Sequence, residues 1–250
     1  MISLRNVTKV FGDKVAVNNL SLDIKKGELF TFLGPNAAGK TTTIKMITGL
    51  LRPTSGEIVV SGKSLKTNID EVKKVISYIP DFPYLYEKLT PIEMFYFFQD
   101  IYELDQKDYE VEIEKLCALF ELEQYKDTLI ENLSHGIKQR VVIALSLFHN
   151  PEVIVIDEPM VGLDPKTSKL VKNILRSKVN EGKTIFLSTH QLHVAQELAD
   201  RIGIINEGQL IALGTLEEIE KLAGKKDSLE ELFLEICLLY TSPSPRDLST

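Results

Sequence analysis

The chain has 250 residues, of which 44% are hydrophobic and 26% are charged, and its formal net charge is −7. This composition suits a globular domain with a large core, and an acidic chain without basic blocks argues against nucleic acid as its partner. No apolar run approaches the roughly 18 residues that a membrane-spanning helix needs, and the first residues do not resemble a signal peptide. Because the two cysteines form no pair motif, we expect a cytoplasmic protein.

The first third of the sequence is rich in strand patterns. Residues 2–7 and 21–24 alternate apolar and polar side chains, and residues 29–34 form a continuous apolar run. Residues 56–62 and 75–80 continue the pattern between Gly and Pro residues. These segments predict an antiparallel β layer near the N-terminus, beside the first strand of a buried sheet.

Helical patterns replace the strands from Pro91 onward. Residues 91–104 and 108–122 have helical character, and Pro91 suits the first turn of a helix. A further helix is expected to begin at about Ser134, where a basic, amphipathic run follows. We therefore predict an inserted helical lobe over about 91–150.

After Pro151, apolar strands alternate with helices. Such alternation predicts a parallel sheet covered on both faces. The expected elements are strand 153–157, helix 167–179, strand 184–188, helix 190–199 and strand 201–206. The fold class is therefore α/β, with a mostly parallel sheet, an N-terminal antiparallel β layer and an inserted α-helical lobe.

The last residues differ from the rest of the chain. Residues 237–250 have no periodicity and contain repeated Ser-Pro pairs. One interpretation is a disordered natural terminus. We favour the other, a non-native tail that resembles translated adapter sequence, and we expect the folded domain to span residues 1–236.

A phosphate loop is the strongest motif. The segment "GPNAAGKT" (34–41) fits G-x-x-x-x-G-K-[ST] and follows an apolar strand and precedes a helix, which is the context that the motif requires. Backbone N–H groups of such a loop, together with the helix N-terminus, hold phosphates. Lys40 would reach the β- and γ-phosphates, and Thr41 would bind Mg²⁺. The chain is therefore expected to have a P-loop NTPase core with ATP and Mg²⁺ as its ligands.

Two adjacent carboxylates complete this site. The buried strand "VIVID" ends in Asp157, which suits the Mg²⁺ of a nucleotide site, and Glu158 follows directly. Glu158 could orient or deprotonate the attacking water. The alternative is a solvated pair of acids at a strand end, without a catalytic role.

A second anion site is indicated at residues 133–140, "LSHGIKQR", called the signature segment below. Ser134 and Gly136 stand at the start of a helix, where a side-chain hydroxyl, a backbone amide and the helix dipole favour an anion. The chain's own phosphate loop already encloses one set of phosphates. The purpose of this second site is not evident from the motif alone.

Five ordered motifs resemble the ATPase subunit of ABC transporters, over residues 1 to about 236. They are "GPNAAGKTT", "LSHGIKQR", "DEP", "GLD" and "STH". The resemblance implies that the phosphate loop holds the nucleotide through Gly34, Pro35, Asn36, Ala37, Ala38, Gly39, Lys40, Thr41 and Thr42. It implies Asp157 at Mg²⁺, Glu158 as catalytic base, His190 near the γ-phosphate and the attacking water, and Phe11 under the adenine.

The resemblance also answers the question of the second anion site. In the family, the signature segment closes over the nucleotide of a second subunit, so Ser134, His135, Gly136 and Gln139 would act in trans. Asp164 would lie in a loop that crosses the subunit interface. The implied assembly is a head-to-tail dimer around ATP, of two copies of this chain or of this chain and a homologous ATPase.

Three positions depart from the usual family pattern. Ala37 replaces a Gly, which would strain the loop if this residue needs a positive φ. Asp81 stands where a Gln usually contacts Mg²⁺ and water, and direct metal contact by this shorter, charged side chain stays open. His135 replaces the first Gly of the signature segment. All three leave the central residues of the site in place.

An aromatic segment indicates a partner surface. Residues 82–102 contain eight aromatic residues, including four in succession from Phe95 to Phe98. Neighbours on a helix lie about 100° apart, so these four side chains cannot all face one core. Some should be exposed at an interface, and the alternative is that they pack the helical lobe. By resemblance, this segment receives a short helix of a separate membrane permease.

The functional expectation is an ATPase subunit that powers transport, with export favoured by resemblance to bacterial exporter subunits. It would lie at the inner face of the cell membrane as a peripheral protein. The alternative is a soluble ABC-type ATPase switch on a non-transport partner. That class usually has a second cassette, a coiled-coil insertion or a basic patch, and none is evident.

Overall fold

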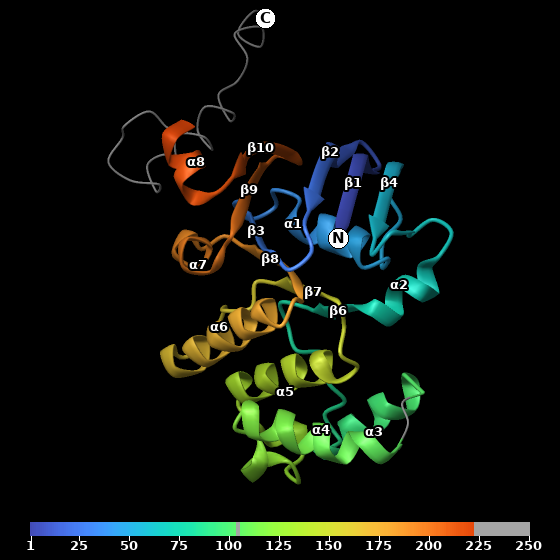
Figure 1. Ribbon diagram of the computed structural model, residues 1–250, viewed down its shortest axis with the longest axis vertical. Coiled ribbons are helices and arrows are strands. Elements are labelled where there is room, and N and C mark those ends of the chain that lie inside the picture. Colours follow the sequence, from blue (N-terminus) through green and yellow to red (C-terminus); the bar gives the residue numbers. More distant parts are fainter. Residues whose placement is uncertain (104–105, 223–250) are drawn as a thin grey trace, which may run out of the picture.

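A computed structural model of the chain describes residues 1–103 and 106–222. The tail expected at 237–250 lies outside these residues, as does the end of the domain proposed at residue 236. Figure 1 shows two sheets in the upper part of the molecule and a group of helices below them. Among the described helices, none is both long and apolar enough to cross a membrane.

Six strands form the central sheet, in the order β10-β9-β3-β8-β7-β6. All neighbouring pairs are parallel except β10 with β9, so the predicted mostly parallel sheet is confirmed. Every residue of β3, β7 and β8 is buried, as expected for strands covered on both faces. The strands are β3 (Leu29–Leu33), β6 (Ile76–Ile79), β7 (Val153–Asp157), β8 (Thr184–Thr189), β9 (Arg201–Asn206) and β10 (Gln209–Gly214).

Four antiparallel strands form the second sheet, in the order β2-β1-β4-β5. The predicted N-terminal antiparallel layer is therefore confirmed. Its strands are β1 (Ile2–Phe11), β2 (Lys14–Ile24), β4 (Ser55–Val60) and β5 (Lys63–Ser64). The first strand is longer than the alternating pattern 2–7 predicts, because register shifts beyond Leu4 break the strict alternation while the pairing continues.

Helix α1 (Lys40–Ile47) packs between the two sheets (Figure 1). Its buried side chains Ile44, Met46 and Ile47 join one core cluster with residues of both sheets. The helix ends at Ile47, and the chain turns at Gly49, which has φ 72°. Because the phosphate loop leads from β3 into α1, the N-terminus of α1 lies near the carboxyl end of β3.

Four further helices lie outside the helical lobe, and together with the two sheets and α1 they form the part of the molecule that is called the core below. They are α2 (Ile69–Val75), α6 (Pro165–Asn180), α7 (Leu192–Leu198) and α8 (Leu216–Leu222). Helix α2, strand β10 and helix α8 are elements that the sequence patterns did not predict. Helix α6 begins at an Asp164 cap whose side chain accepts hydrogen bonds from the N–H groups of Lys166 and Thr167.

The helical lobe is inserted between β6 and β7, which pair with each other in the sheet. It contains α3 (Pro91–Ile101), α4 (Gln106–Leu119), α5 (His135–Phe148) and two 3₁₀ turns, Glu123–Tyr125 and Ile130–Asn132. The capping box of Thr90 and Glu93 starts α3. The lobe and the lower face of the sheet share one hydrophobic cluster, so the insertion is packed onto the sheet rather than linked to it by loops alone.

His149 joins the far end of α5 to the sheet. Its ring stacks on Tyr102 with ring centroids 4.3 Å apart and an interplanar angle of 7°. Its Nε2 lies 3.4 Å from the carbonyl oxygen of Ile76 in β6. Burial lowers the pKa of His149, which favours the neutral ring at this junction between the lobe and the core.

Candidate active site

The site is built where parallel strands end together. Strand β8 lies between β3 and β7, with Ser188 opposite both Phe32 and Asp157. The phosphate loop follows β3, Glu158 follows β7, and His190 follows β8. Because parallel strands present their carboxyl ends at one edge, three motifs distant in sequence converge there.

Two glycines of the phosphate loop have no room for a side chain. A Cβ on Gly34 would lie 2.4 Å from the carbonyl oxygen of Ile205, and one on Gly39 would lie 2.6 Å from the carbonyl oxygen of Ala16. Gly39 also has φ 107°, at the residue before α1. The loop is therefore held tightly between β9 and β2.

Ala37 has φ 64°, which is the left-handed conformation considered in the sequence analysis. A non-glycine residue there costs about 1–2 kcal/mol. The next residue, Ala38, is 3% exposed and has no such conformation, and its N–H donates to the carbonyl oxygen of Pro35. The strain is therefore confined to one position of the loop.

Lys40 is buried inside the loop. Its ammonium donates to the carbonyl oxygens of Gly34 at 2.8 Å and Pro35 at 3.0 Å. Its Nζ lies 3.4 Å from Glu158 Oε1. The Lys40 charge therefore lies between the phosphate loop and the Glu158 carboxylate.

Glu158 is held by contacts from two other motifs. Besides Lys40, its Oε1 lies 3.0 Å from His190 Nδ1, and its Oε2 accepts a hydrogen bond of 3.3 Å from the His190 N–H. Glu158 has φ 47°, a rare conformation for this residue type that the motifs alone did not reveal. This turn directs the carboxylate into the site immediately after the strand ends.

Asp157 is fully buried, and one of its oxygens accepts a hydrogen bond from Ser188. Burial raises the pKa of Asp157, while hydrogen bonds from Ser188 and Thr41 oppose that shift. Its Oδ2 has no hydrogen-bond partner among the described residues. A buried carboxylate oxygen with free acceptor capacity beside the Thr41 hydroxyl fits Mg²⁺, which takes few protein ligands in addition to phosphate oxygens and waters. The role of Ser188 was not foreseen, although it begins the "STH" motif.

A pocket of about 370 Å³ lies beside the phosphate loop and Glu158, while Asp157 and His190 are not among the residues that line it. It contains most of the nucleotide-binding positions expected from the sequence, and Glu158 lies on its wall. The lining is Phe11, Lys14, Ala16, Asn36, Ala37, Gly39, Lys40, Thr41, Thr42, Asp81 and Glu158. Phe11 is 48% exposed at the pocket's rim. The sequence did not predict Lys14 and Ala16 as site residues, because the start of β2 reaches the phosphate loop only through the tertiary fold.

The signature segment starts α5 as predicted. Ser134 is the N-cap, and its hydroxyl accepts a long hydrogen bond of 3.4 Å from Ile137 N–H. Ser134 and His135 are exposed. The expectation for Gln139 needs correction: it is 1% exposed, because it lies on the inner side of α5, and therefore is not on the surface that would contact a second subunit.

Asp164 and the preceding residues form an exposed loop after Glu158. The Asp164 carboxylate accepts a hydrogen bond of 2.6 Å from the Thr167 hydroxyl, which lowers its pKa together with the capping N–H groups. This loop, Val161–Asp164, is called the interface loop below. It adjoins the signature segment in the same chain, since a Cβ on Gly136 would lie 3.8 Å from Asp164 Oδ2.

Comparisons with known proteins agree with this site. Residues 17–161 match the ABC transporter family. The chain is 34% identical to the Escherichia coli (strain K12) ABC transporter ATP-binding protein YbhF over 94% of this chain and 41% of YbhF. It is 38% identical to the Nod factor export ATP-binding protein I of Burkholderia orbicola (strain AU 1054), over 85% of this chain and 70% of that protein.

Solved structures are similar in fold. The structure of an ATP-binding subunit of an ABC transporter has a TM-score of 0.88 and 31% identity, covering 94% of this chain and 99% of that one. The ATP-binding cassette MJ0796, in a dimeric post-hydrolysis state bound to ADP and Pi, has a TM-score of 0.79 and 28% identity, covering 86% and 99%.

The fold and the site thus define an ATP-binding cassette with a P-loop ATPase core. The chain belongs to the ABC transporter family. It spans less than half of YbhF but most of the Nod factor export protein.

A first prediction concerns the two alanines of the phosphate loop. Ala37→Gly should stabilise the protein by about 0.5–1 kcal/mol, because relief of the left-handed strain outweighs the added freedom of the unfolded chain. Ala38→Gly is the control and should destabilise by about 1 kcal/mol or more, since it gains the same freedom in the unfolded chain and also loses a buried methyl group. Urea unfolding of both variants measures the difference, and equal effects at the two positions would contradict the strain at Ala37.

Proposed function

We propose that this chain hydrolyses Mg²⁺-ATP with Glu158 as the general base. The observation that carries the proposal is the position of its carboxylate, on the wall of the phosphate-loop pocket and in contact with Lys40 and His190. Glu158 would accept the proton of a water molecule as that oxygen attacks the γ-phosphorus and ADP leaves. His190 would hold the carboxylate through its Nδ1–H, and when its Nε2 also carries a proton it would donate to the γ-phosphate.

Thr41 and Asp157 would hold Mg²⁺. When bound, the ion would neutralise charge on the β- and γ-phosphates. Asp157 suits this role because its buried Oδ2, which has no hydrogen-bond partner among the described residues, would face a cation that stabilises the charged carboxylate. Asp81 lines the same pocket and would act near the metal or the water.

Phe11 would stack on the adenine at the rim of the pocket. The Lys9 Nζ already lies 4.9 Å from the Phe11 ring centroid, so this exposed ring has a cationic neighbour. The phosphates would be held by the loop amides and side chains, from Gly34, Pro35, Asn36, Ala37, Ala38 and Gly39 to Lys40, Thr41 and Thr42.

We further propose that ATP joins two cassettes head to tail. Ser134 and Gly136 would complete the phosphate site of the neighbouring subunit, through the hydroxyl, the backbone amide and the dipole of α5. The exposure of Ser134 supports this, as does the contact between Gly136 and the interface loop, which places both on one surface. The dimeric cassette among the similar structures is consistent with it.

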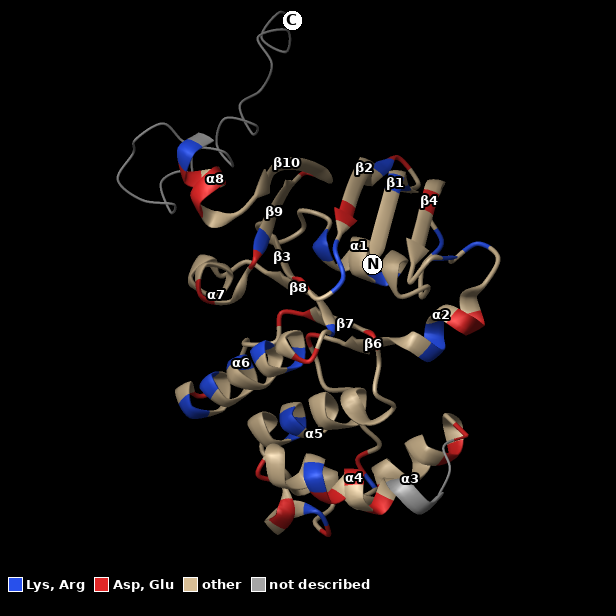
Figure 2. Ribbon diagram, viewed as in Figure 1, with Lys and Arg blue, Asp and Glu red and all other residues tan. Residues whose placement is uncertain are grey.

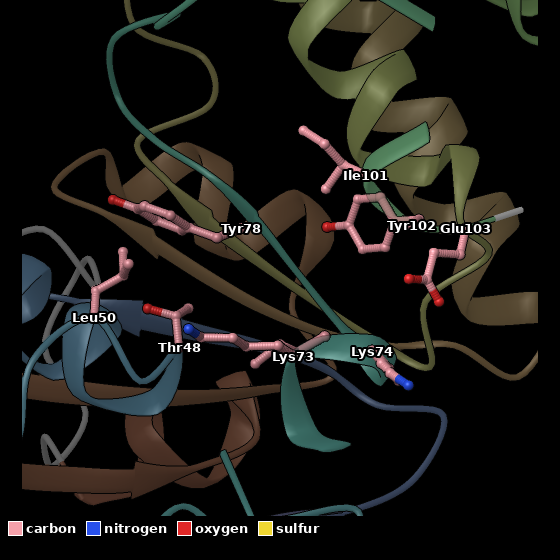
Figure 3. Close-up of a pocket in the computed structure, with 9 residues that line it drawn as sticks. Thr48, Leu50, Lys73, Lys74, Tyr78, Ile101, Tyr102 and Glu103 are labelled. Atoms are coloured by element: carbon pink, nitrogen blue, oxygen red, sulfur yellow. The ribbon is translucent and has the colours of Figure 1, made fainter. Parts of the chain in front are cut away.

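A separate membrane permease would dock in the groove between core and lobe. A groove of about 550 Å³ lies there, with Thr48, Leu50 and Lys73 on the core side and Ile101 and Tyr102 facing them from the lobe (Figure 3). Leu50 is 61% and Ile101 58% exposed, an unusual pair of apolar side chains to leave in water.

Charge adds to the character of this groove. Helix α2 has acidic residues in its first turn and Lys73 and Lys74 in its last turn, beside the groove (Figure 2). A short permease helix with apolar side chains and an acidic residue would fit between the two walls. A groove with apolar and basic side chains that could receive such a helix supports a transport ATPase over the soluble switch.

Some side chains of the aromatic segment pack in the helical lobe, and others are exposed, as the two alternatives in the sequence predicted. Phe95 is fully buried against Phe148, so part of the segment is core. Tyr84 and Tyr86 are 78% and 59% exposed, and Phe97 is 36% exposed with its ring 5.2 Å from that of Tyr86. We propose that these exposed rings extend the permease surface.

The transport direction proposed is export. The multidrug and Nod factor export names of the similar proteins support it. The protein would then lie at the inner face of the cell membrane, with residues 1–236 as its ATPase domain.

Replacement of the proposed base tests the reaction. Glu158→Gln should retain ATP binding but slow turnover by about 10²-fold or more, because the amide cannot accept the proton. Phosphate release and equilibrium nucleotide binding measure the two effects. Near-normal turnover in this variant would remove Glu158 from the role of base.

Action of the signature segment in trans can be tested by mixing two disabled chains. In the Glu158→Gln background, Lys40→Ala disables the phosphate loop and Ser134→Arg blocks the signature segment by bulk. Each alone should fail to dimerise with ATP. Their mixture should form dimers, because one of the two interfaces then pairs an intact loop with an intact signature segment.

The control for this mixture is a chain with both lesions, which leaves no intact pair in any combination. Light scattering or size exclusion with ATP measures the dimer. If the mixture stays monomeric while the Glu158→Gln parent dimerises, the signature segment does not act in trans.

Charge placed in the groove tests permease docking. Leu50→Asp or Ile101→Asp should weaken association with the co-expressed permease at least about tenfold, by losing apolar contact and desolvating a charge. Val111→Asp is the matched control, since Val111 is 53% exposed on α4 and outside the groove. Equal loss in all three variants, or none, would contradict docking at this groove.

A further inference from the structure

The His135 side chain lies between three functional segments. It is the first residue of α5, next to the Ser134 cap, and it is exposed. Its ring contacts the interface loop at Gly162 on one side and Phe82 on another. The family pattern has a glycine at this position, so these contacts exist only because of the substitution.

The contact with Gly162 is close. A Cβ built on Gly162 would lie 3.1 Å from His135 Nε2 and 3.2 Å from its Cδ2, and no other atom would come within 4 Å. The ring therefore covers Gly162 directly, with space for a hydrogen atom and little more. Because Gly162 belongs to the core and His135 to the lobe, this contact crosses between the two parts.

Phe82 provides the second contact. Its ring centroid lies 6.5 Å from that of His135, and Tyr84 packs against its other side at 5.5 Å. Phe82 directly follows Asp81, which lines the nucleotide pocket. The His135 ring is thus packed beside the segment that follows Asp81.

The same junction contains Gly136. A Cβ there would lie 3.8 Å from Asp164 Oδ2 and 3.9 Å from Thr167 Oγ1. The start of α5 and the interface loop therefore meet at two successive residues, and together they form the exposed surface proposed to receive a second subunit.

We infer that His135 is a positioning residue, whose ring sets the distance between the signature segment and the interface loop before a second subunit binds. This rests on the proposed head-to-tail dimer. Both segments must fit the same partner at once, and a glycine at 135 would leave each free to move. A ring that orders them in the free chain reduces the entropy lost when the dimer forms.

The test measures the ATP concentration that gives half-maximal dimer in the Glu158→Gln background. His135→Gly should raise this concentration about three- to tenfold, the range expected for ordering one or two additional residues. His135→Phe keeps a ring of similar shape without charge or hydrogen-bonding nitrogen. It should restore dimerisation to within about twofold of the parent.

A double-mutant cycle identifies the contact responsible. Gly162→Ala adds a methyl group against the His135 ring, and it also strains a residue with φ 74°. The strain is the same with or without His135, so it cancels in the cycle. Gly162→Ala should therefore weaken dimerisation more in the His135 chain than in the His135→Gly chain.

Several results would overturn the inference. Additive effects in the cycle would show that the ring and Gly162 do not act together. Failure of His135→Phe to rescue would assign the effect to charge or hydrogen bonding at the partner's nucleotide. If His135→Gly lowered the ATP affinity of the dilute monomer by the same factor as it raised the ATP concentration for dimerisation, the defect would lie in the chain's own nucleotide pocket.

If the proposed head-to-tail dimer is wrong, the same experiment gives a different result. In that case the Glu158→Gln parent itself would not dimerise with ATP, and the positioning role would fall with it. A parent that dimerises normally and is insensitive to His135→Gly would leave the proposed dimer intact and reject the role of His135 alone.

Discussion

The parallel alignment of β3, β8 and β7 is the constraint on which the active site depends. Ser188 sits between Phe32 and Asp157 in register, so the phosphate loop, the two carboxylates Asp157 and Glu158, and His190 all leave the sheet at one edge. A shift by one residue would turn Asp157 to the opposite face of β7, away from Thr41. These strands are buried on both faces, so a shift would also exchange side chains between two packed faces and disrupt the packing on each.

This edge concentrates groups that are costly in isolation. Asp157 is buried with one oxygen lacking a partner, Lys40 is buried among carbonyl oxygens, and Ala37 and Glu158 adopt left-handed conformations. Each arrangement opposes stability by an amount comparable to one or two hydrogen bonds. Lys40 is compensated by its contacts with Gly34, Pro35 and Glu158, whereas the buried Asp157 oxygen has no hydrogen-bond partner among the described residues.

Helix α5 connects two surfaces of the helical lobe. Helix α5 has the signature segment at its N-terminus and His149 at its other end, beside Tyr102 of the groove. The helix is continuous and buried along its inner side. One continuous helix therefore spans the distance between the signature segment and the residue that stacks on the groove's Tyr102.

Local sequence determined the features that depend on short-range chemistry. The phosphate loop, the helix starting at Ser134 and the apolar runs of the sheet follow from glycine conformations, capping and strand periodicity. The strain at Ala37 was likewise foreseeable, since only the residue type at one loop position was needed. The tertiary structure decided what depends on packing between distant segments: the burial of Gln139, the exposed and buried aromatic rings, and the contacts of Glu158 with Lys40 and His190. The contact of His135 with Gly162 belongs to the same group, because its two residues come from separate parts of the fold and no local pattern encodes the distance between them.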